Sequence, residues 1–284
     1  YKRQGVLRVR CNVFRQRKGI AGAFRILPTR ILTAEQLGLP DAVIKFANLT
    51  KGLVVMTGPP GSGKSTTQAA LLDHVNRTKR RHIITIEDPI EYVHENKLSL
   101  INQREIRRHT RSFDSALRSA LREDPDIILV GEMRDLETIS LAVTAAETGQ
   151  LVFGTLHTAS AAQTIDRLIN VFKTGRQEQI RAMLAESLHG VVAQRLLRRA
   201  DGKGRVAALE VLIGTPAVRA LIRSNKTFQI PSTMQTGRRE GMQLLDDCLA
   251  DLVQRDIITS QEAHRHAAAK DRFGDSEEGE AAAA

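Results

Sequence analysis

A glycine-rich loop between an apolar run and a helical pattern constrains this chain more than any other feature. Residues 58–65 read Gly-Pro-Pro-Gly-Ser-Gly-Lys-Ser, which matches the pattern G-x-x-x-x-G-K-[ST] without a gap. The apolar run 52–56 predicts a buried strand before the loop, and 64–76 predicts a helix after it. Glycines allow the backbone to fold around phosphates with its N–H groups inward, and a helix N-terminus adds partial positive charge. The sequence therefore predicts a loop that binds a nucleoside triphosphate.

The predicted phosphate contacts are the loop itself and the residue that follows it. They are Gly58, Pro59, Pro60, Gly61, Ser62, Gly63, Lys64, Ser65 and Thr66. We expect the Lys64 ammonium to reach the β- and γ-phosphates and the Ser65 hydroxyl to hold Mg²⁺. ATP and Mg²⁺ are therefore the expected ligands.

Carboxylates follow two further apolar runs. The segment 87–91 carries three acids, ending in Glu91, directly after the run 82–86. Glu132 follows the run 126–130 in the same way. In an open α/β sheet, ligands bind at the carboxyl ends of the strands, so acids there can position Mg²⁺ and activate a water molecule. The alternative is that these acids are surface residues paired with neighbouring arginines.

A histidine occupies the corresponding place after a fourth apolar run. His157 follows the run 151–154 and lies between two threonines. At this edge of the sheet it could sense the γ-phosphate through a hydrogen bond. A single histidine in such a position is otherwise a structural residue, and the sequence alone leaves both interpretations open.

Short apolar runs alternate with helical patterns from about residue 51 onward. This alternation predicts an α/β domain with a mostly parallel sheet covered by helices on both faces. Beyond about residue 177 the pattern is mainly helical, with one extra strand expected over 206–211 and an exposed turn over 201–204. With 284 residues, the chain is long enough to bury a large core.

The N-terminal part has a different pattern. Residues 6–10 alternate as a strand does, and 20–27 read as the second strand of a hairpin, with Gly19 near the turn. Two strands alone do not make a stable domain, so we expect a truncated N-terminal domain here. The predicted segments are the end of that domain, a linker with the start of the next domain, the main domain and a disordered acidic tail. These segments are 1–29, 30–50, 51–270 and 271–284.

Charge is distributed unevenly. Lys and Arg number 42 against 32 Asp and Glu, a formal net charge of +10, yet no acid precedes Glu35. A basic segment can meet an anion, or it can be a solvated strand face. Aromatic residues make up only 4% and Trp is absent, which argues against a nucleic-acid surface built on base stacking. Two cysteines also exclude a four-cysteine zinc module.

Four blocks, in this order, resemble the motifs of the secretion ATPase superfamily of type II secretion and type IV pilus motors. Residues 58–66 resemble its Walker A motif, 85–94 its Asp box, 117–135 its Walker B motif and 148–158 its His box. The resemblance covers about residues 5–267. It implies a RecA-like P-loop ATPase domain preceded by the remnant of a PAS-like N-terminal domain.

The same resemblance implies roles for individual residues. Glu91 would be the general base, Glu132 would organise Mg²⁺ and its waters, and His157 would contact the phosphate end of the nucleotide. Arg10 and Arg25, on the two predicted N-terminal strands, match arginines that reach the γ-phosphate in the family. The resemblance further implies a homohexamer in the cytoplasm, peripheral to the inner membrane, that acts on an inner-membrane pilus platform protein without binding nucleic acid directly.

Two features point to the pilus-retraction branch of this superfamily and to twitching motility. Extension and secretion members usually carry the four-cysteine zinc module, and residues 217–223 (AVRALIR) resemble the retraction motif A-I-R-N-L-I-R. Gln150 stands where the His box usually has a histidine, and Gln68 and Lys173 are polar where apolar residues or proline are expected. An accessory retraction paralogue, another secretion-type ATPase, a nucleic-acid-stimulated RecA-like motor and a regulatory nucleotide-binding subunit are the alternatives.

Overall fold

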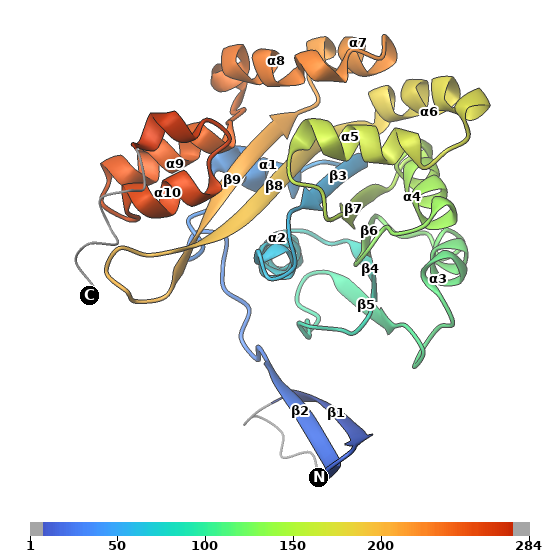
Figure 1. Ribbon diagram of the computed structural model, residues 1–284. Coiled ribbons are helices and arrows are strands. Elements are labelled where there is room, and N and C mark those ends of the chain that lie inside the picture. Colours follow the sequence, from blue (N-terminus) through green and yellow to red (C-terminus); the bar gives the residue numbers. More distant parts are fainter. Residues whose placement is uncertain (1–7, 275–284) are drawn as a thin grey trace.

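A computed structural model describes residues 8–274 of the chain, in which a seven-stranded sheet lies between two layers of helices (Figure 1). The sheet has the strand order β5-β4-β6-β7-β3-β8-β9, and only the β8–β9 pair within it is antiparallel. Its strands are β3 (Gly52–Thr57), β4 (His82–Glu87), β5 (Leu100–Glu105), β6 (Ile127–Val130), β7 (Leu151–Thr155), β8 (Leu188–Arg198) and β9 (Arg205–Ile213). The predicted α/β class and mostly parallel sheet are therefore confirmed.

Helices cover both faces of this sheet. One layer is formed by α3 (Phe113–Ala120), α4 (Leu136–Thr148), α5 (Ala161–Asn170), α6 (Thr174–Ser187) and α7 (Pro216–Arg223), and the other by α1 (Asp41–Phe46) and α2 (Lys64–Thr78). The C-terminal helices α8 (Ile230–Thr236), α9 (Leu245–Gln254) and α10 (Ser260–His266) follow, with α9 and α10 packed on β8 and β9. Short 3₁₀ helices occur at η1 (Thr227–Gln229), η2 (Gly237–Glu240) and η3 (Lys270–Phe273).

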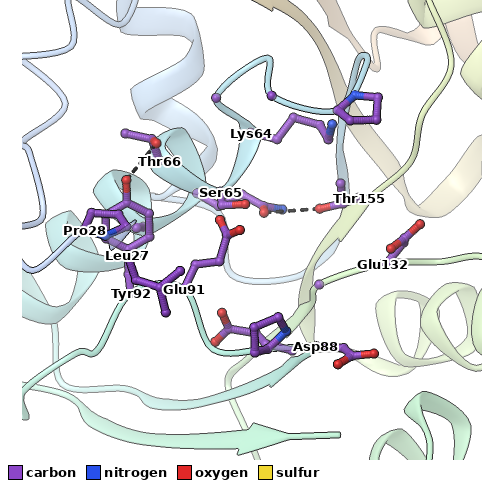
Figure 2. A pocket seen from close by; sticks show the side chains of 18 of the residues that line it. Leu27, Pro28, Lys64, Ser65, Thr66, Asp88, Glu91, Tyr92, Glu132 and Thr155 are labelled. Atoms are coloured by element: carbon purple, nitrogen blue, oxygen red, sulfur yellow. Dashed lines mark hydrogen bonds between the residues drawn. The ribbon is translucent and has the colours of Figure 1, made fainter. Parts of the chain in front are cut away.

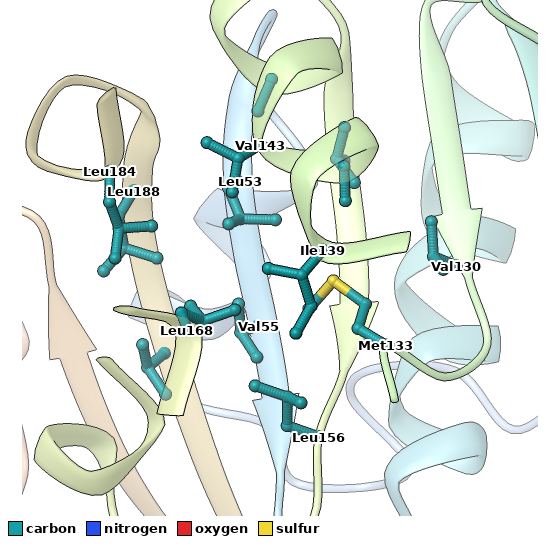
Figure 3. Close-up of a cluster of buried hydrophobic side chains, with 14 of the residues drawn as sticks. Leu53, Val55, Val130, Met133, Ile139, Val143, Leu156, Leu168, Leu184 and Leu188 are labelled. Carbon is teal, nitrogen blue, oxygen red and sulfur yellow. The ribbon is translucent and has the colours of Figure 1, made fainter. Parts of the chain in front are cut away.

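Strand β3 shows why its sequence is a continuous apolar run. Leu53 and Val55 pack with the α4–α5 layer, as Figure 3 shows, while Val54 and Met56 pack with α1 and α2. All four side chains are fully buried. A strand covered on both faces needs apolar residues at every position, because successive side chains point to opposite faces.

The N-terminal hairpin stands apart from the sheet (Figure 1). Strands β1 (Arg8–Gln16) and β2 (Gly19–Leu27) pair antiparallel and turn at Gly19, whose φ of +118° favours glycine. This two-stranded sheet lies where we expected the remnant of an N-terminal domain. One face carries exposed apolar side chains, among them Ile20 and Phe24. The first two residues of the predicted strand 6–10 lie outside the described residues.

Two strands were not predicted, and the tail differs from expectation. Strand β5 is an edge strand of mixed polarity, and β8 falls in a stretch that the sequence predicted to be mainly helical. Tertiary packing overrides local preference in β8: a Cβ at Gly190 would lie 2.1 Å from the ring of Phe46, so α1 packs directly on the strand backbone. Residues 271–273, expected to be disordered, belong to η3, while 275–284 lie outside the described part.

Candidate functional site

The phosphate loop joins β3 to α2 as the sequence predicted. Three of its glycines have positive φ: Gly58 at +133°, Gly61 at +77° and Gly63 at +89°. Gly63 is also the residue immediately before α2, and it adopts the left-handed conformation. A side chain at these positions would strain the backbone, so the glycine spacing of the motif follows from the shape of the loop.

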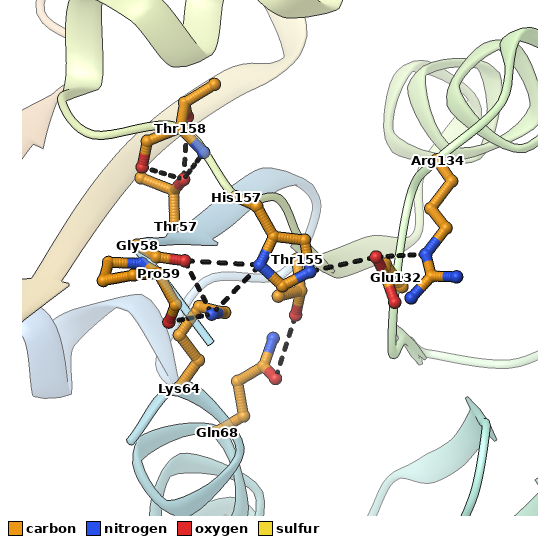
Figure 4. Close-up of polar contacts among 10 residues, drawn as sticks. All are labelled: Thr57, Gly58, Pro59, Lys64, Gln68, Glu132, Arg134, Thr155, His157 and Thr158. Carbon is orange, nitrogen blue, oxygen red and sulfur yellow. Dashed lines mark hydrogen bonds and ion pairs between the residues drawn. The ribbon is translucent and has the colours of Figure 1, made fainter. Parts of the chain in front are cut away.

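Lys64 points back across the loop and is almost fully buried. Its Nζ donates to the carbonyls of Gly58 at 2.7 Å and Pro59 at 3.0 Å (Figure 4). Burial lowers the pKa of Lys64, while the charges of Glu132 and Glu91 oppose that shift. The ammonium is thus held at the mouth of the loop, in a cavity whose nearby acids favour its charged form.

The loop opens into a cavity of about 660 Å³, a size typical of small-molecule sites. Its lining includes the loop, the start of α2, the segment after β4, the ends of β6 and β7, and the linker after β2. Neighbouring strands β4, β6, β7 and β3 all present their carboxyl ends to it. The four blocks singled out in the sequence therefore meet at one edge of the sheet.

Glu91 lies on a segment without regular structure between β4 and β5. Figure 2 shows its carboxylate pointing toward Ser65 at the start of α2. The next residue, Tyr92, is 8% exposed, and its hydroxyl lies 2.8 Å from the Thr66 hydroxyl. Gln103 of β5 donates to the carbonyl of Tyr92 at 2.9 Å. The segment is therefore attached on one side to α2 and on the other to the edge strand.

A half-buried histidine lies on the same segment. The backbone N–H of His94 donates to Gln103 Oε1 at 2.9 Å. Burial lowers the pKa of His94 to about 4, with the charge of Asp73 opposing and that of Lys97 adding to the shift. His94 is accordingly neutral at pH 7. Asp73, a buried acid of α2, pairs with Lys97 farther along the segment.

Glu132 and His157 are in direct contact in the wall of the cavity. His157 Nε2 lies 2.9 Å from Glu132 Oε1, and its Nδ1 lies 3.4 Å from Lys64 Nζ (Figure 4). Desolvation opposes ionisation of Glu132, but hydrogen bonding and charge from Arg134, together with His157, outweigh it and lower its pKa. The geometry thus links the predicted Walker B acid, the His-box histidine and the loop lysine in one chain of contacts.

Arginines of the hairpin reach the segment that carries Glu91. Arg25 Nη2 lies 3.9 Å from the Glu91 carboxylate, and Arg25 lines the cavity. Arg8 donates to the carbonyls of Glu91 at 2.8 Å and Ile90 at 2.9 Å. Arg10 lies opposite Arg25 in the hairpin register but is exposed and is not among the residues that line the cavity.

The donors around Ser65 and Glu132 fit a magnesium ion. Mg²⁺ prefers oxygen ligands and is usually held by one or two protein oxygens together with substrate phosphates and water. A serine hydroxyl at the start of α2 and an ionised carboxylate across the cavity supply that set. In the described residues there is no group of three or more histidine, cysteine or acidic side chains of the kind that holds a metal without a substrate.

The structure also locates the sequence departures and residues that sequence reasoning missed. Gln150 precedes β7 at the end of that strand away from the cavity, where its Oε1 accepts from Thr148. Gln68 lies in the cavity wall and accepts from the Thr155 hydroxyl at 3.2 Å. The missed residues include Arg8, two residues before the predicted Arg10, and Tyr92, which lies within the Asp box beside Glu91 but was given no role.

Residues 217–223, which resemble the retraction motif, lie in α7. Two of their arginines are four residues apart and therefore lie on the same side of the helix. Arg223 pairs with Glu186 of α6, and Arg219 lies 4.0 Å from the same carboxylate. Val218 and Ile222 are buried in the core, as the amphipathic pattern predicted. Within the described residues, α7 is therefore attached to α6 by both its apolar and its basic residues.

The fold and this cavity define a P-loop protein of the α/β class that binds a nucleoside triphosphate at the carboxyl edge of its sheet. The family model of the type II/IV secretion system proteins matches residues 24–280. The chain belongs to this family.

Individual proteins within this family are also similar to the chain. The chain is 56% identical, over 95% of its length and 78% of the relative's, to a Pseudomonas aeruginosa protein named Type IV pilus retractation ATPase PilT. It is also 56% identical to a Neisseria gonorrhoeae Twitching motility protein, covering 92% of this chain and 70% of that one. A crystal structure of the pilus retraction motor PilT with bound ADP matches with a TM-score of 0.89 and 49% identity, over 96% of this chain and 77% of that one.

Proposed function

We propose that the chain is an ATPase of the type IV pilus retraction branch, which hydrolyses ATP and uses the energy to withdraw pili in twitching motility. The observation that carries the proposal is the convergence of Lys64, Glu91 and Glu132 on one cavity at the end of the phosphate loop. The identity to a retraction ATPase and a twitching protein supports the same conclusion. Two cysteines leave no four-cysteine zinc module in the sequence.

In the proposed reaction, the loop and the α2 N-terminus bind the phosphates of ATP through residues 58–66. Lys64 releases its two loop carbonyls and pairs with the β- and γ-phosphates. Ser65 and Glu132 would hold Mg²⁺, which would neutralise charge on the phosphates. His157 contacts the γ-phosphate from the opposite side.

Glu91 is proposed as the general base. Its carboxylate accepts the proton of a water molecule that attacks the γ-phosphorus in line with the bond that breaks, and ADP is the leaving group. Arg25, with Arg10 opposite it on the same hairpin face, stabilises the charge that develops on the γ-phosphate. Because Arg25 already lies beside Glu91, a modest movement of the hairpin brings both groups to one substrate.

The assembly is proposed from the family. A homohexamer at the inner face of the cytoplasmic membrane, acting on an inner-membrane platform protein, would convert hydrolysis into pilus movement. No helix among residues 8–274 is both long and apolar enough to span a bilayer.

A complementation experiment tests the proposal. The parent gene is expressed in a piliated host deleted for its own retraction ATPase, and surface pili and twitching are recorded. Restored twitching with fewer surface pili is expected. Persistent hyperpiliation with the protein expressed would overturn retraction and favour an accessory retraction paralogue or another secretion-type ATPase. DNA-stimulated hydrolysis that falls with salt would instead indicate a nucleic-acid motor.

A further inference from the structure

A buried amide lies directly behind the phosphate loop. Gln194, on β8, is 2% exposed, and both ends of its side chain are hydrogen-bonded. Its Nε2 donates to the carbonyl of Ser62 at 2.8 Å, and its Oε1 accepts from the Thr67 hydroxyl at 2.9 Å. A single side chain, far from the loop in sequence, thus holds both the loop and the first turn of α2.

The orientation of this amide is fixed by chemistry. A carbonyl oxygen only accepts hydrogen bonds, so the NH₂ group of Gln194 must face Ser62. The carbonyl of Gln194 then faces Thr67, whose hydroxyl donates to it. A flipped amide would place two acceptors against each other in a buried site, which is costly.

The loop also packs tightly on the strand. A Cβ at Gly58 would lie 2.2 Å from the backbone carbonyl oxygen of Gln194, and a Cβ at Gly63 would lie 2.7 Å from its side-chain Nε2. Both distances are too short for any side chain. The glycines of the motif therefore also permit close contact between the loop and β8, apart from any contact with phosphate.

We propose that Gln194 is a positioning residue for phosphate binding, an inference that rests on the proposed role of the loop. In a trans peptide the C=O and N–H groups point in opposite directions. Because Gln194 holds the Ser62 carbonyl against β8, the N–H of Gly63 in the same peptide points away from β8. Gly63 lines the nucleotide cavity, so Gln194 fixes a phosphate-binding donor without touching the phosphate.

The test compares two glutamine variants of the full chain. Gln194→Leu removes both hydrogen bonds and keeps a similar volume. Gln243→Leu is the matched control, because Gln243 Nε2 donates to the Leu209 carbonyl at 2.9 Å but lines no part of the cavity. Calorimetric ADP binding, steady-state ATP hydrolysis and thermal unfolding without nucleotide are measured for each variant.

We expect Gln194→Leu to weaken ADP binding and raise KM for ATP about tenfold, with kcat within about threefold of wild type. Gln243→Leu should leave ADP affinity within about twofold, even if both variants unfold at lower temperature. Unchanged ADP affinity in Gln194→Leu, or equal weakening in the two variants, would overturn the positioning role.

Two further variants keep the test decisive. If Gln194→Leu does not fold, Gln194→Met, whose thioether cannot donate to Ser62, is compared with Thr67→Val, which removes only the Thr67 contact. The methionine variant should weaken ADP binding several-fold more than the valine variant, and equal effects would contradict the proposal. Lys64→Ala separates the two claims: if it retains ADP affinity, the phosphate-binding role of the loop fails, whereas if it alone loses affinity, only the role of Gln194 fails.

Discussion

The phosphate loop and the β1–β2 hairpin both bring cations to the same cavity, but they are held in opposite ways. The loop sits between a strand with every side chain buried and a helix packed on the sheet, and a buried amide braces it from behind. The hairpin stands apart from the sheet and presents Ile20 and Phe24 to solvent. The loop is therefore held by buried contacts with the sheet, whereas Arg8 and Arg25 link the hairpin to the surface segment that carries Glu91.

The largest expected effect falls on the phosphate-loop side of this comparison. Lys64→Ala removes the cation at the mouth of the loop, so ADP affinity should fall at least about 100-fold, since a charge-assisted contact to phosphate is lost in a partly desolvated site. Calorimetric titration measures the change. Lys51→Ala, at an exposed lysine before β3, is the control and should bind ADP as wild type does.

Substitutions should lower the free energy of unfolding more in the strand before the phosphate loop than in the hairpin. Leu53→Ala opens a cavity in the fully buried strand β3 and should lower the free energy of unfolding by about 2–5 kcal/mol. Phe24→Ser, on the hairpin face that is exposed in the monomer, should change it by less than about 0.5 kcal/mol. Urea unfolding measures both, and a large loss in Phe24→Ser at low protein concentration would contradict the contrast.

Acid should weaken the segment that connects the two regions. Burial lowers the pKa of His94 to about 4, so between the ordinary histidine value near 6.5 and pH 4 the unfolded chain binds a proton that the folded chain does not. Stability from this group is therefore present above about pH 6.5 and falls as pH drops toward 4. From pH 7 to pH 4.5 wild type should lose about 2 kcal/mol more than His94→Gln in urea unfolding. Parallel losses in the two proteins would refute this origin.

The smallest expected effect belongs to the hairpin. Arg25→Ala should lower kcat for ATP hydrolysis about tenfold while leaving ADP affinity within about threefold, because its proposed target is charge that develops on the γ-phosphate. Arg10→Ala should follow in the same direction with a smaller change. Arg15 lies on the opposite face of the hairpin, and Arg15→Ala serves as the control. A drop in ADP affinity equal to the drop in kcat would place Arg25 in ground-state binding instead.

The phosphate-loop half of the site is also the half that the sequence predicts well. A strand buried on both faces, a glycine pattern and a helix start each have a local signal, so residues 52–76 were predicted with nearly the right bounds. Glu91, Glu132 and His157 follow apolar runs, and their convergence follows from the rule for parallel strands.

The other contacts depend on tertiary placement that no local pattern encodes. Strand β8 was predicted as helix because its apolar content fits either element. Its position beside β3 brings Gln194 to Ser62 of the phosphate loop, which lies 132 residues earlier in the sequence. Arg8 meets Ile90 and Glu91 across 82 and 83 residues. Gln150, which replaces a usual histidine of the predicted His box, precedes β7 at the end of that strand away from the cavity.

The most direct test of the account is hydrolysis by Glu91→Gln, measured against ATP binding by the same protein. The substitution keeps the shape of the side chain and removes its ability to accept a proton. We predict a loss of at least about 100-fold in kcat with ATP affinity within about threefold of wild type. Turnover near the wild-type rate would contradict the assignment of Glu91 as the base, and with it the mechanism proposed for this motor.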